Sequence, residues 1–275
     1  MSRHRLVARF IDGACGRILV VARFPGQVTG RCVLVVPPFA EEMNKSRPSI
    51  AQLADRLATR GIATVLPDLG GTGDSDGEFR DADWDAWRRD IVATAAWAAA
   101  QGWPVDAMLG IRLGCALAAE AVRELPEPIS HAVFWAPVAD GRTYLTQFLR
   151  LRVAAAMVSD GPAETTTSLR ARMTAGDVLE IAGYALGPRL ADRIDRIRLA
   201  DIISPALGEL CWMEVARSDP PAMPDAAGRA IEQARALGVR VSPLAVAGEP
   251  FWAATEIVVN RPLVDGTIAA LAGPT

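Results

Sequence analysis

Apolar runs and amphipathic stretches alternate along most of this chain. Two runs with alternating polarity, Arg5–Ile11 and Arg17–Phe24, are joined by an Asp-Gly turn and predict an antiparallel pair of strands. The next run, Cys32–Pro38, is continuously apolar, as is typical of strands buried on both faces of a parallel sheet. A polar loop is expected to follow at 40–46.

Beyond that loop, the pattern alternates between the helical and the extended period. Helices are predicted at 50–57, 84–95, 225–237 and 261–272, with one more directly after Gly114. Strands are predicted at 62–66, 105–109, 131–136, 210–216 and 240–247. Strands that alternate with helices indicate a doubly wound, mostly parallel α/β sheet.

One segment interrupts this alternation. Residues 141–207 have a helical pattern and are rich in arginine and acidic side chains. The chain is therefore predicted to have a core made of residues 1–140 and 208–275, with 141–207 inserted as a helical lid.

The composition restricts the classes of function. The 275 residues are 51% hydrophobic, which is enough for one large core, and the net charge of −3 does not favour a nucleic-acid partner. No apolar run reaches the ~18 residues of a membrane span, and the first residues lack the apolar stretch of a signal peptide. We expect a cytoplasmic protein without a membrane span.

Metal and cofactor binding are not expected from the residue inventory. The four cysteines are scattered and form no C-x-x-C pair, which argues against a zinc site or a disulfide framework. The chain has only two histidines, His4 and His131, and neither lies near a cysteine or carboxylate cluster in the sequence. We therefore predict no metal site and no cofactor.

The segment 105–124 resembles the nucleophile elbow of α/β-hydrolases. A short apolar strand runs into Gly110-Ile111-Arg112-Leu113-Gly114, and a helix follows. Glycines two places before and after the central residue allow strand and helix to approach closely at a strained turn. The central residue, usually serine, is Arg112, whose guanidinium stays protonated and is no nucleophile.

The other members of a Ser-His-Asp triad are also missing. In this fold the triad histidine follows the last strand, whereas His4 lies near the amino terminus and His131 opens a strand. Cys115 is expected to be a small buried residue where helix and sheet pack, rather than a displaced nucleophile.

Candidate ligand contacts come from loops at the carboxyl ends of the strands, where such sheets bind ligands. The loop after Pro38 stands where hydrolases place an oxyanion-hole amide, and it supplies Phe39, Ala40, Glu41, Glu42, Asn44 and Lys45. The elbow supplies Arg112 and Leu113, with a helix N-terminus that favours anions. The alternatives are a solvated loop with local ion pairs, and an Arg112 that pairs internally with Glu41 or Glu42.

Two further regions lie near the expected positions of the triad acid and histidine. Asp219 belongs to the first, and Glu249, Phe251 and Trp252 belong to the second. A raised pKa would make Glu249 a general base, and the two aromatic residues are expected to line the pocket or the core. The glycine-rich turn 68–77 is expected to be structural.

Three motifs together resemble the second exosortase A system-associated hydrolase family. They are Pro37 to Arg47, Gly110 to Gly114 and Gly248 to Trp252, with Trp135-Ala136-Pro137-Val138 as further support. The resemblance implies an α/β-hydrolase fold and a setting of exopolysaccharide and PEP-CTERM protein sorting. It also implies an acyl or aminoacyl thioester as ligand, free or on an acyl carrier protein.

Two functions remain open from the sequence. In the first, the protein acts on acyl esters or thioesters without a triad: Arg112 holds a carboxylate or oxyanion, and Glu41, Glu42, Asn44 and Lys45 supply base and donors. In the second, it is a catalytically inactive ligand-binding or scaffold protein that keeps the fold and the pocket.

Overall fold

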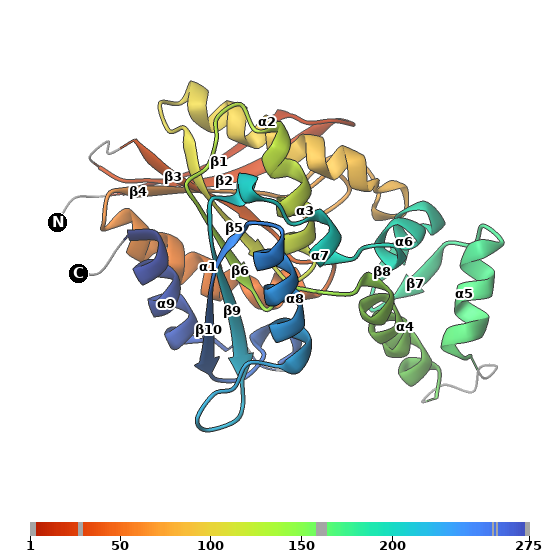
Figure 1. Ribbon diagram of the computed structural model, residues 1–275. Helices are drawn as coiled ribbons and strands as arrows, with labels where there is room; N and C mark the ends of the chain where they lie inside the picture. The colour runs from red at the N-terminus through yellow and green to blue at the C-terminus, as the bar shows by residue number, and fades with distance from the viewer. Residues whose placement is uncertain (1–3, 27–29, 158–163, 255, 257, 273–275) are drawn as a thin grey trace.

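A central eight-stranded sheet organises the computed structural model, which describes residues 4–26, 30–157, 164–254, 256 and 258–272 (Figure 1). The strand order is β1-β2-β4-β3-β5-β6-β9-β10, and β2 alone runs antiparallel to the other strands. The strands are β1 (Arg5–Asp12), β2 (Arg17–Phe24), β3 (Arg31–Val36), β4 (Ile62–Pro67), β5 (Val105–Ile111), β6 (His131–Trp135), β9 (Glu209–Ala216) and β10 (Arg240–Ala247). The predicted doubly wound, mostly parallel sheet is confirmed.

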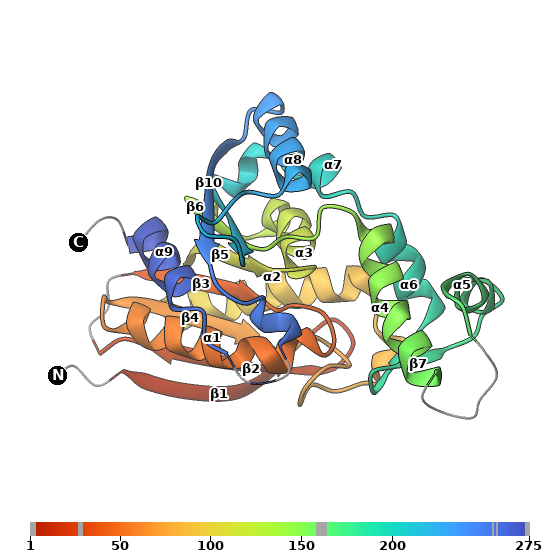
Figure 2. The ribbon, with the colours of Figure 1, turned by 90° about the horizontal axis from the view of Figure 1, so that it is seen from below.

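Helices cover both faces of this sheet (Figure 2). On one face lie α1 (Glu42–Ala58) and α9 (Arg261–Ala272), and on the other lie α2 (Trp84–Ala100), α3 (Gly114–Ala121) and α8 (Asp225–Ala236). The central strands β3 and β5 are buried on both faces, which accounts for their continuous apolar sequences. Short 3-10 turns occur at η1 (Phe79–Asp81), η2 (Val122–Glu124), η3 (Pro205–Leu207) and η4 (Phe251–Ala253).

The segment between β6 and β9 projects from one side of the core. It contains α4 (Gly141–Ala156), α5 (Thr166–Thr174), α6 (Pro188–Asp195) and α7 (Leu199–Ile202). It also contains a hairpin of β7 (Leu179–Ile181) and β8 (Tyr184–Leu186), which the helical prediction for 141–207 did not include. The turn between these strands, Ala182-Gly183, has positive φ at both residues, as two-residue hairpin turns require.

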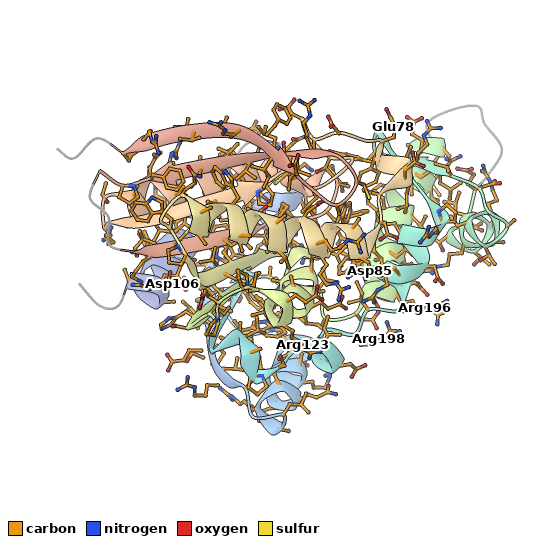
Figure 3. The ribbon with its side chains drawn as sticks, turned by 90° about the horizontal axis from the view of Figure 1, so that it is seen from above. Glu78, Asp85, Asp106, Arg123, Arg196 and Arg198 are labelled. Atoms are coloured by element: carbon orange, nitrogen blue, oxygen red, sulfur yellow. The ribbon has the colours of Figure 1, made fainter. Side chains whose placement is uncertain are left out.

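The lid lies toward the carboxyl ends of the parallel strands. Figure 3 shows Arg196 and Arg198 in the lid, whereas Asp106, at the start of β5, lies at the far end of the sheet. Asp106 is held there by hydrogen bonds from Arg31 and from the amide of Cys32. The inserted segment therefore lies next to the carboxyl edge of the sheet.

The predicted polar loop at 40–46 is wrong, because α1 already begins at Glu42. Pro48 lies within the helix. The helix forms because Glu42 and Met43 donate backbone hydrogen bonds to Phe39 and Ala40, and because the Glu42 side chain is buried against the core. None of the described helices is long and apolar enough to cross a membrane.

Candidate functional site at the elbow

The elbow has the backbone geometry that its glycines predict. Arg112 follows β5 with φ = 55°, and its amide donates to the carbonyl of Trp135, 2.9 Å away. A Cβ on Gly110 would lie 2.7 Å from Cα of Cys115, and one on Gly114 would lie 2.3 Å from the carbonyl oxygen of Pro37. Positive φ in a bulky residue costs of order 1–3 kcal/mol, so this conformation persists because its surroundings enforce it.

Two backbone amides beside the elbow are available to a ligand. Leu113 follows Arg112, and Ala40 follows β3 with φ = 51°. These are the positions from which the fold builds an oxyanion hole. Within the described part of the chain neither amide nitrogen donates a hydrogen bond, and both residues line the same cavity.

The Arg112 side chain is bound within the protein. Its Nε donates to Oε1 of Glu42 at 3.2 Å, and Nη1 donates to the carbonyl of Ala136 at 2.8 Å. The guanidinium also lies 4.7 Å from the ring centre of Trp252 and 5.8 Å from that of Tyr144. The predicted alternative of an internal ion pair is therefore present, with Glu42 as the partner.

The pair is electrostatically coupled in a buried environment. Glu42 is 6% exposed, and burial raises its pKa, although Arg112 and then Tyr144 favour the charged form. Burial is the largest effect on Arg112 and disfavours its charge, but Glu42, Tyr144 and Cys115 together outweigh burial and raise the pKa of Arg112. The second carboxylate oxygen of Glu42 is buried and makes no hydrogen bond of standard geometry, although the Tyr144 hydroxyl lies beside the carboxylate.

Glu41 forms a second carboxylate site next to the first. Its Oε2 is buried without a hydrogen-bond partner, and burial, followed by repulsion from Glu42, raises its pKa against the opposing attraction of Lys45. Its charge in turn raises the pKa of Tyr184, second to the effect of burial. Tyr144 and Tyr184 come from α4 and β8, so the lid contributes both tyrosines of the chain to this cluster.

A cavity of about 170 Å³ opens beside the elbow. It is bounded by the end of β3, the first turns of α1, α2 and α3, the loop after β4, and the lid strand β8. Its lining residues are Pro37, Pro38, Phe39, Ala40, Met43, Asn44, Arg47, Asp68, Leu69, Thr72, Gly73, Trp84, Trp87, Leu113, Gly114, Leu117 and Tyr184.

The structure brings together only part of the predicted set. Phe39, Ala40, Asn44 and Leu113 line the cavity. Arg112, Glu42, Glu41 and Trp252 form the adjoining charged cluster, and Lys45 acts on it through its charge.

The residues predicted from the two C-terminal loops are not among those that line the cavity. Phe251 is fully buried and packs edge-on against Trp135 and Trp252, which is the core position predicted as one of its two alternatives. Glu249 is exposed and paired with Arg217, and Asp219 is exposed in the loop after β9. Neither the Glu249 carboxylate nor the Asp219 carboxylate is among the main groups that shift the pKa of Arg112.

The histidines and Cys115 lie where the sequence placed them. His131 stands at the amino end of β6, 3.7 Å from Glu209, and His4 is 3.1 Å from Asp55 on the surface. Cys115 is fully buried, and burial raises the pKa of its thiol well above the ordinary value. Among the described residues, no group of three or more potential metal ligands comes together.

Sequence reasoning missed several residues of this site. Glu214 on β9 is half-buried beside the cluster, where burial raises its pKa, and it accepts a hydrogen bond from Trp212. Tyr144 and Tyr184 could have been identified as candidates from the sequence, because they are the only two tyrosines of the chain and both lie in segment 141–207.

Solved structures with this fold are numerous. Est1E from Butyrivibrio proteoclasticus, solved with ferulic acid bound, has a TM-score of 0.67 at 18% identity, over 96% of this chain and 100% of that one. A serine hydrolase without a lid from Xanthomonas campestris has a TM-score of 0.56 at 15% identity, over 98% and 93%. A putative carboxylesterase from Lactobacillus plantarum has a TM-score of 0.58 at 11% identity, over 99% and 100%. These identities support the fold alone.

The comparison with curated protein sequences gave no match. A family model, Hydrolase_4, described as serine aminopeptidase S33, matches residues 30–194, which is more than half of the chain. The α/β-hydrolase fold predicted from the elbow is therefore confirmed, and the chain belongs to the serine aminopeptidase S33 family.

Proposed function

We propose that this protein binds a small acyl ligand in the cavity beside the elbow and forms no covalent acyl-serine. The observation that carries this proposal is the identity of residue 112 and the hydrogen bonds that its side chain makes. The side chain there is an arginine bound to Glu42 and to the carbonyl of Ala136, while the amides of Ala40 and Leu113 remain without acceptors. A carbonyl or carboxylate oxygen of the ligand accepts hydrogen bonds from these two amides.

In this proposal Arg112 acts on the ligand through its positive charge and not as the main contact. Its Nη2 makes no hydrogen bond and is not fully buried among the described residues, so one donor remains for an anionic group. The resemblance to exosortase-associated hydrolases supports an acyl or aminoacyl thioester, free or carrier-bound, and a cytoplasmic location, as part of the same proposal.

Calorimetry with hexanoate tests the binding, and a fluorogenic thioester of the same chain length tests turnover. We expect saturable binding without turnover. Leu117→Phe places a larger side chain in the wall of the cavity and should weaken binding at least about tenfold, or about 1.4 kcal/mol, because the ring occupies space that the ligand needs. Leu237→Phe adds the same ring at an exposed position and should leave binding unchanged. Absence of binding by hexanoate and by the three aromatic acids tested below would contradict the proposal.

A second candidate function is hydrolysis by water, with Glu41 as general base. It is favoured by the raised pKa of Glu41 and by its buried, unpartnered oxygen next to the cavity. Turnover of the thioester by the wild type, abolished in Glu41→Gln while hexanoate binding stays within a few-fold, would establish this function instead.

A further inference from the structure

We infer that the cavity accepts an aromatic acyl group with a hydroxyl at the end remote from its carbonyl, and that the Arg47–Asp68 pair recognises this hydroxyl. The inference rests on the proposed function, because it concerns the same cavity. It adds the class of acyl group and the residues that select it.

The length of the cavity follows from the sheet topology. One end is formed by Leu113, at the carboxyl end of β5, and the other by Asp68 and Thr72, beyond the carboxyl end of β4. Because β3 lies between β4 and β5, the two ends are separated by about two strand spacings, or roughly 10 Å. A phenyl ring joined to a carboxyl group through two carbons spans this distance.

The walls between these ends are aromatic. Trp84 and Trp87 line the cavity, and their indole N–H groups are already bound elsewhere, to Glu120 at 2.8 Å and to the carbonyl of Gly70 at 2.8 Å. The indoles are thereby fixed, and their donors are not available to a ligand. Phe39 packs edge-on against Trp87, with ring centres 6.3 Å apart. Fixed aromatic walls favour a planar ring, which packs in offset or edge-to-face geometry.

The remote end is polar and close to neutral. Arg47 donates from Nη2 to Oδ1 of Asp68 at 2.8 Å, and Oδ2 of Asp68 accepts from the amide of Asp74 at 3.2 Å. Asp68 is 5% exposed, whereas Arg47 is half-buried and, within the described residues, makes no other hydrogen bond.

This end matches a hydroxyl better than a second carboxylate. The free N–H groups of Arg47 donate to a hydroxyl oxygen, and the hydroxyl proton has the Asp68 carboxylate as acceptor. A carboxylate would place a second negative charge beside Asp68, whose charge already balances that of Arg47. Asn44, exposed at the mouth, adds a further amide donor.

A chemical double-mutant cycle tests the inference. Calorimetry compares hydrocinnamate, its para-hydroxy derivative and its para-carboxy derivative, with hexanoate as the aliphatic reference. The wild type should bind the para-hydroxy acid at least about tenfold more tightly than hydrocinnamate, the effect of one hydrogen bond to a charged group. In Arg47→Met this preference should disappear, so that the para-hydroxy acid and hydrocinnamate bind with about equal affinity. Arg56→Met, on the same helix but paired with Asp265 at the surface, should keep it.

The outcomes separate this inference from the proposed function. Equal binding of hydrocinnamate and the para-hydroxy acid by the wild type overturns the inference, and so does tighter binding of the para-carboxy acid. Binding of hexanoate but of none of the aromatic acids overturns it while leaving the proposed function intact. Failure of all four acids overturns the proposed function. Should Arg47→Met not fold, Arg47→Lys keeps a cation for Asp68 but loses the planar fork, and it should also reduce the preference.

Discussion

The ion pair at the elbow should contribute more to stability than any surface pair of this protein. Arg112→Met removes the cation from Glu42, whose carboxylate is only 6% exposed. Loss of one partner from a buried pair costs about 3–5 kcal/mol, since the remaining charge is left uncompensated. We expect a loss of at least about 3 kcal/mol, the lower end of this range. For a chain of this size, a loss of about 3 kcal/mol lowers Tm by roughly 10 °C.

Urea unfolding followed by circular dichroism measures this effect, with two variants for comparison. The double variant Arg112→Met/Glu42→Leu removes both charges and should lie within about 1–2 kcal/mol of the wild type, because an apolar pair can replace a buried ion pair. Arg196→Met removes an exposed arginine that is paired with Asp192 one turn away, and should cost less than about 0.5 kcal/mol.

The sign of the pH dependence provides a second check. In Arg112→Met the pKa of Glu42 rises further, so folding then favours the protonated carboxyl. The variant should therefore regain stability as the pH falls through that raised pKa, and lose it as the pH rises. Wild-type stability in Arg112→Met at pH 7, together with lost hexanoate binding, would refute the structural role and identify Arg112 as a ligand group.

Other outcomes follow from the same geometry. A fluorophosphonate should leave the protein unlabelled by intact-mass spectrometry, and stoichiometric labelling of a single serine would contradict the predicted absence of a serine nucleophile. Burial raises the pKa of Glu41, so Glu41→Gln should flatten the loss of stability that the wild type shows as the pH rises above the ordinary glutamate pKa; an unchanged slope in urea titrations would contradict this. Gly114→Ala should destabilise by several kcal/mol, because its Cβ would lie 2.3 Å from a backbone oxygen of Pro37, and an unchanged Tm would show that the elbow relaxes.

Most of the fold was predictable because its signals are local. Continuous apolar runs predicted the buried strands β3 and β5, and glycines at 110 and 114 predicted the close approach of strand and helix that the structure contains. The start of α1 was not predictable in this way. Its first turn is stabilised by burial of Glu42 against Arg112, which is 70 residues away, and no local pattern carries that information.

The candidate site was predictable at the backbone level and less so at the level of side chains. Loop position correctly indicated that Ala40 and Leu113 face the same cavity. It did not indicate that Phe251 turns inward beneath Trp252, because both residues are equally apolar and the difference depends on packing against Trp135. Tyr144 and Tyr184 were not predicted for a related reason. They come close to Glu41 and Glu42 only because the inserted segment packs against the core.

The proposed binding function accounts for the retained elbow through its backbone. Ala40 and Arg112 have positive φ, and Ala40 and Leu113 line one cavity; this backbone arrangement depends on the glycines and on the close packing around them, not on the chemistry of side chain 112. A serine at 112 would add a nucleophile; an arginine bound by Glu42 instead fills the position with a closed ion pair and leaves the amides free. The same strained turn can therefore serve a catalyst or a binder, and the side-chain partners of residue 112 decide between them.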